Sequence, residues 1–475
     1  MFVVTKKLFK MLIPFLLISI LLIFNACSII TNKNNNSDFM IVSHIESAES
    51  MTSKPSGDYP YVTGSFIQPF ALMNLSQDRI AIHLSTLKEV GIDTIILQWS
   101  AITPNGIFQD VYYPSENSKT NHTDNFTASN IAMIENLLSA AEKLGMKVFI
   151  GLNNADEWWN FGPTNKAWNE KQAETGLIIA QEIYDLYKIK YPNALHGWYY
   201  VWEMSNGNII KWPQANGELL NLYLNGLTKI DSSMPMMLSP FICEVDGSAE
   251  QTGNKLKEML EVANFRNGDI YCSQDSIGAG YMSIDKLDKY FSAINDAIKN
   301  EVGLQFWANN ENFIQATWSA ASIDRFVAQL KIASKYVTGY VTFSYSHYYS
   351  PDFASTSIYH EIYKKYYLTG NLPIIDCPST PEIAINIING RDAIAVSMTI
   401  MQNTYGIKAV EIFINDKLID TITNDHIESN SEIKLSSYIN LSDIEKNESI
   451  QITAIAYDLN KNKSQIGKTE YTKIN

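Results

Sequence analysis

The sequence predicts an α/β fold, a (β/α)8 TIM barrel, followed by a small all-β sandwich. Short apolar segments alternate with longer amphipathic ones from Tyr61 to Leu368, as in a parallel sheet wound with helices. Eight strand-like segments in about three hundred residues match one closed barrel. After Gly370 the helical pattern stops and short alternating strands take over, which is typical of a sandwich.

Residues 1–27 have the pattern of an export signal. An apolar run, Met11–Phe24, leads to Ala26 and Cys27. Basic residues precede this run at Lys6, Lys7 and Lys10. The cysteine after Ala26 resembles the bacterial lipoprotein signal, which implies a lipid on Cys27 and attachment to the outer face of a bacterial membrane. An uncleaved membrane anchor is the alternative, although the run is short for a spanning helix.

Residues 28–58 are polar and rich in Asn and Ser. This composition predicts a flexible linker between the membrane and the folded part of the chain. We therefore expect the barrel over residues 59–370 and the sandwich over residues 371–475.

The barrel strands are short segments rich in apolar residues. We predict them at Val62–Gln68, Thr94–Trp99, Lys147–Leu152, Gly197–Glu203, Met236–Phe241, Asp269–Asp275, Leu304–Glu311 and Tyr340–Tyr345. Ser76 is expected to cap the first helix, which Gly91 ends, and Gly145 is expected to end the second. Six further helices are predicted at Gly176–Lys190, Glu218–Ile230, Lys255–Ala263, Ile284–Lys299, Ser322–Tyr336 and Tyr359–Tyr367.

The C-terminal region follows a linker marked by three prolines, Pro373, Pro378 and Pro381. Its strands are predicted at Glu382–Ile388, Ala393–Met401, Ala409–Phe413, Glu432–Ser436, Ser449–Tyr457 and Lys468–Lys473, with a short segment at 414–418. Gly406–Lys417 and Ala454–Asn460 resemble the immunoglobulin-like modules of bacterial surface enzymes. Such a module is a spacer or a carbohydrate-binding unit.

Charge and composition exclude several function classes. The net charge of −14 argues against a nucleic-acid partner. No phosphate-binding glycine motif is present, so no nucleotide cofactor is expected. The seven histidines form no zinc-binding pattern, so no catalytic metal is expected, although carboxylate-only calcium sites leave no such pattern. Apart from Cys27, the cysteines Cys243, Cys272 and Cys377 are odd in number; Cys243 and Cys272 either pair or stay free.

Two strands end on a carboxylate. Glu203 closes the fourth predicted strand and Glu311 closes the seventh. In a (β/α)8 barrel the carboxyl-terminal strand ends carry the reacting groups, so the two acids are expected to face each other across that end. Such a pair can cleave a glycosidic bond as general acid and nucleophile. On the seventh strand, Trp307 and Asn309 share the side of Glu311.

Five motifs carry a closer resemblance: Gly64–Gln68, Gly91–Trp99, Gly197–Glu203, Gln274–Gly278 and Trp307–Glu311. Together they resemble a glycosidase-like bacterial barrel family catalogued as domain of unknown function 4434. Acids on strands four and seven also resemble the clan of retaining glycoside hydrolases. That resemblance implies that Glu203 is the acid/base and Glu311 the nucleophile. The clan usually has Asn before the strand-four acid, where this chain has Trp202.

Other polar and aromatic residues are predicted at the same end of the barrel, where amides, acids and rings suit sugar hydroxyls and faces. The substrate-binding candidates are Gln68, Gln98, Trp99, Asn153, Trp202, Asp275, Trp307, Asn309, Asn310, Tyr345 and His347. For Asp275 the alternative is a structural acid. The loop 156–161 with Trp168, Trp212 and Trp318 could stack further sugars of an extended glycan.

The leading hypothesis is a surface-anchored glycoside hydrolase acting on an oligo- or polysaccharide. The alternative is a glycan-binding lipoprotein without activity. A metal-dependent barrel hydrolase is disfavoured, because the first strand, Gly64–Gln68, lacks the histidines such enzymes carry. The carboxylate separation would decide between retention, at about 5–5.5 Å, and inversion, at about 6.5–9.5 Å.

Overall fold

The computed structural model describes residues 57–301, 303–354, 356–372, 377–387, 393–424, 427–428 and 431–474. The predicted export signal, Cys27 and most of the predicted linker lie outside these residues. Within the described part of the chain, no helix has the length and apolar character needed to cross a membrane.

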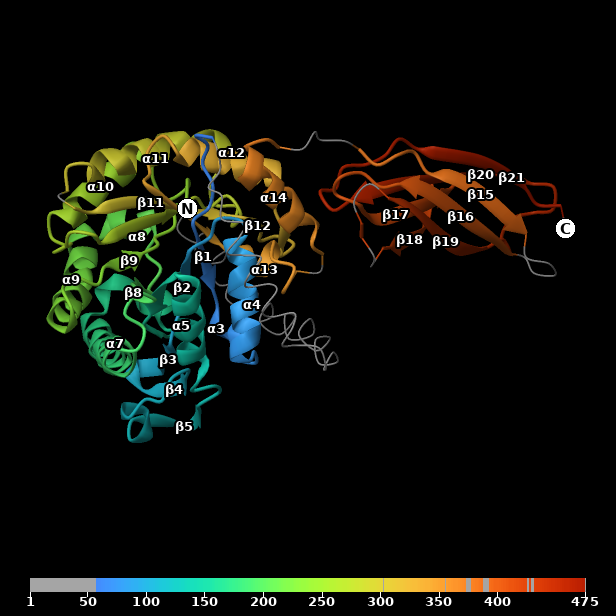
Figure 1. Cartoon of the computed structure of the whole chain (residues 1–475). Coiled ribbons are helices and arrows are strands. Elements are labelled where there is room, and N and C mark those ends of the chain that lie inside the picture. The colour runs from blue at the N-terminus through green and yellow to red at the C-terminus, as the bar shows by residue number, and fades with distance from the viewer. Residues whose placement is uncertain are drawn as a thin grey trace. The chain divides into compact units, whose positions relative to one another are not determined.

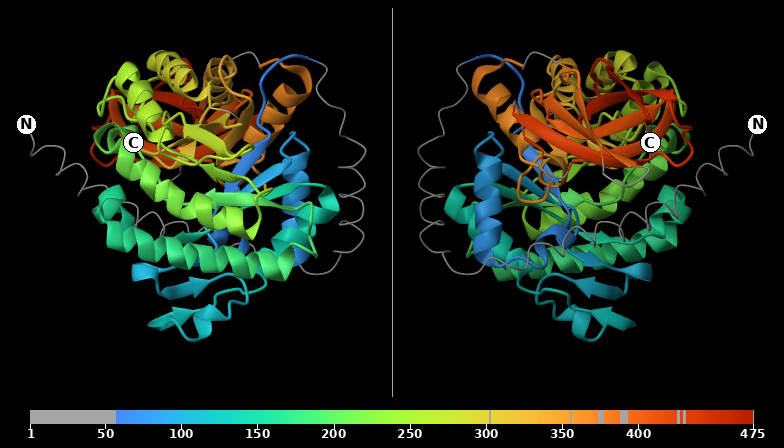
Figure 2. Two further views of the ribbon diagram at one scale, coloured as in Figure 1. Left: turned by 90° about the vertical axis from the view of Figure 1, so that its left-hand side faces the viewer. Right: turned by 90° about the vertical axis from the view of Figure 1, so that its right-hand side faces the viewer.

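Eight parallel strands form a closed barrel, and helices surround it (Figures 1 and 2). The strands are β1 (Gly64–Ile67), β2 (Thr94–Leu97), β6 (Lys147–Gly151), β8 (Leu195–Tyr200), β9 (Met236–Leu238), β10 (Ile270–Gln274), β11 (Gln305–Glu311) and β14 (Gly339–Phe343). All eight predicted strands are confirmed. Several end earlier than predicted, and β8 stops three residues before Glu203.

All eight predicted helices of the barrel are present, although several begin or end some residues away from the predicted bounds. They are α4 (Gln77–Lys88), α5 (Met133–Leu144), α7 (Lys166–Tyr187), α9 (Pro213–Ile230), α10 (Ala249–Leu260), α11 (Ile284–Ile298), α12 (Ile323–Ala333) and α14 (Ile358–Thr369). Ser76 caps α4 by accepting the N–H of Arg79, and Gly145 ends α5 in the left-handed conformation. Helix α7 begins ten residues before the predicted Gly176, because the Asn165 side chain caps it.

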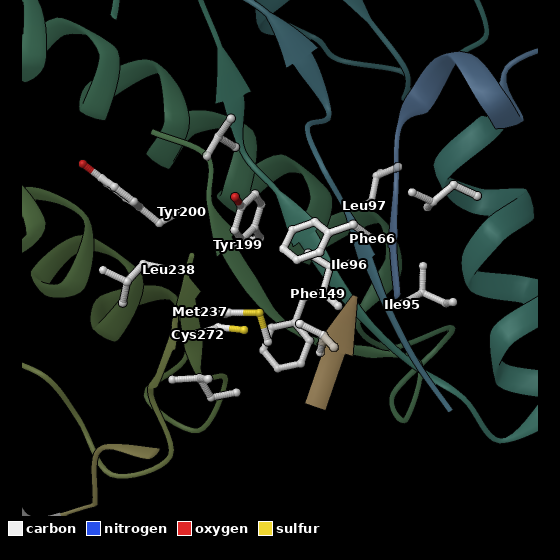
Figure 3. Close-up of a cluster of buried hydrophobic side chains, with 14 of the residues drawn as sticks. Phe66, Ile95, Ile96, Leu97, Phe149, Tyr199, Tyr200, Met237, Leu238 and Cys272 are labelled. Atoms are coloured by element: carbon white, nitrogen blue, oxygen red, sulfur yellow. The ribbon is translucent and has the colours of Figure 1, made fainter. Parts of the chain in front are cut away.

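Alternating side chains fill the barrel interior and its outer surface (Figure 3). Phe66, Phe149, Tyr199 and Met237 gather in the middle, and the rings of Phe66 and Tyr199 lie 5.1 Å apart. Tyr200 points the other way and contacts Tyr223 of α9. Burial of such side chains stabilises the fold by about 1.5–3 kcal/mol each. Tyr199 thus lies on the face of β8 that points into the barrel, and Tyr200 lies on the opposite face.

Two small sheets accompany the barrel in segments for which the sequence predicted no strand. One joins β3 (Ala101–Ile102), β4 (Phe108–Val111), β5 (His122–Thr127) and β7 (Asn153–Asn154), at the bottom of Figure 1. The other is a hairpin of β12 (Phe313–Ile314) and β13 (Ser319–Ala320) directly after β11. Short helices also occur in the loops: α3 (Pro69–Leu72), α6 (Trp158–Phe161), α8 (Asn206–Lys211) and α13 (Tyr345–Tyr348).

The C-terminal region is all-β and antiparallel, as predicted. One sheet contains β15 (Glu382–Ile387), β16 (Ala393–Met401) and β19 (Glu432–Asn440); the other contains β18 (Lys417–Thr423), β17 (Ile407–Ile414), β20 (Ser449–Asp458) and β21 (Gly467–Thr472). Alternate residues such as Val396, Ile412 and Ile452 are fully buried and form the core.

All three cysteines outside the signal are free, so Cys243 and Cys272 do not pair.

Candidate active site

Glu203 and Glu311 lie at the same end of the barrel. Glu311 is the last residue of β11, and Glu203 lies three residues beyond β8. Only β9 and β10 separate these two strands in the closed sheet. Glu311 is 2% exposed, and Glu203 is largely buried. The charge of Glu203 raises the pKa of Glu311, so the carboxylates are close enough to interact.

The main chain at Glu203 is held by a neighbouring loop. Trp158 of α6 donates its indole N–H to the carbonyl oxygen of Glu203 at 2.9 Å. Burial raises the pKa of the Glu203 carboxyl to about 7, although a hydrogen bond from the Gln274 side chain opposes this rise. A carboxyl with this pKa carries a proton for part of the time at neutral pH, as a general acid must.

Glu311 is held at both its side chain and its main chain. The backbone N–H of Ala279 donates to Oε2 of Glu311 at 2.7 Å. Arg325 of α12 donates to the Glu311 carbonyl oxygen at 2.9 Å. Burial, followed by the charge of Asp275, raises the pKa of Glu311 well above its ordinary value. The side chain is thus fixed in position, and its ionisation depends on its neighbours.

Asp275 lies behind Glu311 and is fully buried. Its Oδ1 accepts the backbone N–H of Ile277 at 3.2 Å and that of Glu311 at 3.3 Å. Its Oδ2 accepts the side-chain amides of Asn310 at 2.9 Å and Gln329 at 2.5 Å. Burial raises its pKa. Asp275 therefore ties β11 to α12 and the loop after β10, which makes it a positioning residue.

Ser239, directly after β9, connects Gln274 of β10 with Asn309 of β11. Gln274, whose amide lies by Glu203, donates to the carbonyl oxygen of Ser239 at 2.8 Å. Asn309 donates to the Ser239 hydroxyl at 3.1 Å from the layer beneath Glu311. Gln274 begins the motif Gln274–Gly278 but no role was predicted for it, and no feature of the sequence pointed to Ser239.

Two tyrosines lie near the acids and were not predicted. Burial raises the pKa of Tyr281, and the charges of Glu203 and Glu311 add to this rise, which places the ring close to both. Burial and the charge of Glu311 raise the pKa of Tyr348. Tyr281 lies in the loop after β10, three residues beyond the motif Gln274–Gly278, and the sequence around it gave no sign that its ring would approach the acids.

Some of the predicted binding residues lie at the same strand ends. Gln68, Gln98 and Trp99 are partly buried at the ends of β1 and β2, and Oε1 of Gln98 is buried without a hydrogen-bond partner. His347 of α13 stacks on Phe70 with ring centroids 5.7 Å apart. Burial lowers the pKa of His347 to about 4, so this imidazole is neutral at pH 7.

Five other predicted residues contact neighbouring segments of the barrel or its helices instead. Trp202 donates its indole N–H to the Tyr223 hydroxyl of α9 at 2.6 Å, and Asn153 donates to Gln172 of α7. The Tyr345 hydroxyl bonds His360 of α14 at 3.0 Å. Asn310 is committed to Asp275, and Trp307 lies four residues below Glu311, against Gly339. These five residues support the wall of the site.

Within the described residues, no three His, Cys, Asp or Glu side chains converge as metal ligands. At this end of the barrel the carboxyls of Glu203 and Glu311 interact with each other, and the pKa of each is raised. Ionisation of one of two interacting acids raises the pKa of the other, so the pair loses its protons in two steps and holds a single proton over a range of pH between them.

Solved structures with this architecture include carbohydrate-active enzymes. A Bacteroides thetaiotaomicron protein provisionally named an alpha-L-fucosidase is 22% identical, with a TM-score of 0.54 over 66% of this chain and 97% of its own. An endo-beta-1,4-mannanase from Thermotoga petrophila is 12% identical, with a TM-score of 0.42 over 88% of this chain and 98% of its own. At a TM-score of 0.54, the first of these structures shares the fold of the barrel.

No curated protein matches the sequence. A family model does match it, over residues 62–355, from the start of β1 to the loop after β14. This range contains both acids and more than half of the chain. The chain therefore belongs to the family described as Domain of unknown function (DUF4434).

Proposed function

We propose that this protein is a glycoside hydrolase that cleaves an oligo- or polysaccharide with Glu203 and Glu311. One observation carries the proposal: two carboxyls with raised pKa values, Glu311 buried and Glu203 partly buried, lie at the carboxyl-terminal end of a (β/α)8 barrel. In this architecture reacting groups lie at that end. Cleavage of a glycosidic bond needs one carboxyl to be protonated and the other to be ionised.

We assign the acid/base role to Glu203 and the nucleophile role to Glu311. With a pKa of about 7, Glu203 can give its proton to the leaving oxygen and recover one from water. Oε2 of Glu311 is held by the N–H of Ala279, which leaves Oε1 to attack the anomeric carbon. Positive charge grows on the sugar in the transition state and favours the ionised form of Glu311.

The test is hydrolysis of a panel of aryl glycosides by the wild-type chain and by Glu203→Gln, Glu311→Gln and Glu174→Gln variants. Glu174 is an exposed acid of α7 and serves as the matched control. Each Glu variant should lose about 10³-fold or more of the activity, with the control unchanged. A substrate with a 2,4-dinitrophenolate leaving group, which needs no acid, should restore Glu203→Gln and not Glu311→Gln.

Full activity in both Glu variants would overturn the proposal. Binding of a glycan without any turnover would favour the alternative of a non-catalytic glycan-binding protein.

We also propose that the chain is exported and anchored through a lipid on Cys27, because the basic, apolar and Ala-Cys segments follow one another in residues 1–27. Mass spectrometry of the mature N-terminus tests this part independently.

A further inference from the structure

Trp318 stands out among the tryptophans for its exposure and its backbone. Its side chain is 39% exposed, whereas the other tryptophans are buried or partly buried. Its φ of 48° lies in the left-handed region, which is unfavourable for a bulky side chain. Strained residues of this kind gather at ligand-binding and catalytic sites.

The hairpin that carries Trp318 is fixed to the structure around Glu311. Arg325 donates to the carbonyl oxygen of Phe313 at 2.7 Å and also to that of Glu311. The N–H of Gln315 donates to the carbonyl oxygen of Gly278 at 2.8 Å, and Gly278 precedes the Ala279 N–H that binds Glu311. The indole therefore has a defined position relative to the carboxylate.

A series of stacked rings leads from the neighbourhood of Glu311 to Trp318. Tyr348, whose pKa the Glu311 charge raises, stacks on Phe313 with centroids 5.5 Å apart and planes 18° apart. Trp318 stacks on the same Phe313, with centroids 5.9 Å apart and planes 4° apart. Phe313 supports the indole from below, and the exposed part of Trp318 remains available to a ligand.

Other tryptophans that could stack a sugar are occupied. Trp158 and Trp168 are buried, at 4% and 6% exposed, and contact Trp202. Lys211 covers the ring of Trp212 at 4.2 Å from its centroid. Of the five tryptophans that the sequence suggested for stacking beyond the acids, these three are committed to other contacts, and a fourth, Trp159, is partly buried against the barrel core.

The loops around Glu311 are free of positive charge. Residues 239–248, 275–283, 312–322 and 344–357 follow β9, β10, β11 and β14 and contain neither Lys nor Arg. They do contain Glu244, Asp246, Asp275 and Asp352. The guanidinium of Arg325 is committed to backbone carbonyls. A ligand with carboxylate or sulfate groups would be repelled there.

We propose that Trp318 is the stacking platform of a second sugar-binding subsite, which takes a sugar ring without negative charge. The apolar face of such a ring packs on the exposed indole, while the adjoining unit of the same oligosaccharide lies at Glu203 and Glu311. The inference rests on the proposed function for the role of the two acids. It adds the length and the charge of the substrate.

The decisive variant is Trp318→Gly, because glycine accepts a φ of 48° without strain. This variant should fold at least as stably as the wild type. It should raise KM for a neutral oligosaccharide about ten-fold or more, the factor that 1.4 kcal/mol of lost binding gives. The one-sugar aryl glycoside of the same unit should react within two-fold of wild type. Trp318→Phe should raise this KM by an intermediate factor. The control is Tyr438→Ala, which removes an exposed ring of β19 and should leave KM unchanged.

A binding measurement keeps this test separate from catalysis. In the full chain labelled with 5-fluorotryptophan, the ¹⁹F resonance of Trp318 is the one missing from Trp318→Gly. The probes are cello-, manno-, xylo- and chito-oligosaccharides of four to six units, with oligogalacturonides of the same length for comparison. A neutral probe should shift this resonance, and the oligogalacturonides should not.

Any other outcome would contradict either the subsite at Trp318 or the proposed hydrolase activity, and the two cases can be told apart. Equal losses on the long and the one-sugar substrate, or no loss on the long one, would overturn the subsite and leave the hydrolase proposal intact. A Trp318 resonance that no neutral probe moves, or that oligogalacturonides move equally, would overturn it as well. Binding at Trp318 without any hydrolysis would overturn the proposed hydrolase and leave the subsite standing.

Discussion

The backbone N–H of Ala279 donates to Oε2 of Glu311 at 2.7 Å, across 32 residues of sequence. The contact depends on the glycine that precedes it. A Cβ atom on Gly278 would lie 2.6 Å from the Phe313 carbonyl oxygen and 3.0 Å from Oε2 of Glu311. The loop after β10 can approach the end of β11 only because residue 278 has no side chain.

Gly278→Ala is therefore expected to displace the Glu311 side chain. We predict a loss of about 10²-fold or more in kcat on a confirmed substrate, since a shift of about 1 Å at a reacting group has effects of this size. Steady-state kinetics measures it. Gly280→Ala is the matched control, because a Cβ there meets nothing within 4 Å although φ is 76°. It should cost stability and keep kcat near wild type; equal kcat losses would contradict the steric explanation.

Asp275→Asn should change both stability and the titration of Glu311. The buried Asp275 accepts hydrogen bonds from Asn310 and Gln329, and an amide cannot accept all of them, so we expect a loss of about 2–3 kcal/mol in the free energy of unfolding. The charge of Asp275 also raises the pKa of Glu311. Its removal should move the acidic limb of the pH–rate profile to lower pH, and an unmoved limb would contradict this coupling.

The two acids should make the fold less stable at alkaline pH. Burial raises the pKa of Glu203 from 4.5 to about 7, so the folded state binds this proton more tightly than the unfolded state does. Its contribution is full below pH 4.5 and is lost as pH rises through about 7. Glu203→Gln should therefore be more stable than wild type at pH 8, by at most about 3 kcal/mol, and equal to it at pH 4.

Urea unfolding at both pH values measures this difference. Asp156→Asn, at an exposed position, should match the wild type at both. A Glu203→Gln variant that is no more stable at pH 8 would mean that Glu203 titrates normally, which would also weaken its assignment as the acid.

Glu89 is expected to behave in the opposite sense. His360 and Lys364, both of α14, lower the pKa of this carboxyl to about 2. Its stabilising contribution is present above pH 4.5 and is lost as pH falls through about 2. Glu89→Gln should cost about 2 kcal/mol at pH 7 and nothing at pH 2, as measured by chemical unfolding.

An exposed ion pair provides the comparison for Glu89. Glu116 and Lys119 are 78% and 64% exposed, so Glu116→Gln should change the free energy of unfolding by less than about 0.5 kcal/mol. A similar effect of the two substitutions would show that the partial burial of Glu89 has no consequence.

The sequence determined the order of the elements, because their signals are local. Apolar strands, helix caps such as Ser76 and glycine stops such as Gly145 act within a few residues, so the barrel and the C-terminal strands could be predicted. The placement of Glu203 and Glu311 at one end of the barrel followed from the same order, since Glu311 ends a parallel strand and Glu203 lies three residues beyond one.

Only the tertiary structure decided how the site is completed. Alternation predicts the direction of a side chain only while the backbone stays extended, and β8 ends at Tyr200. Trp202 lies beyond that point, so its contact with Tyr223 could not be predicted from the alternation. The partners of Glu311 come from Ala279 and Arg325, and Gln329 reaches Asp275 across 54 residues. Such contacts depend on how α12 and the loop after β10 pack together, and packing between distant segments leaves no periodic pattern in the sequence.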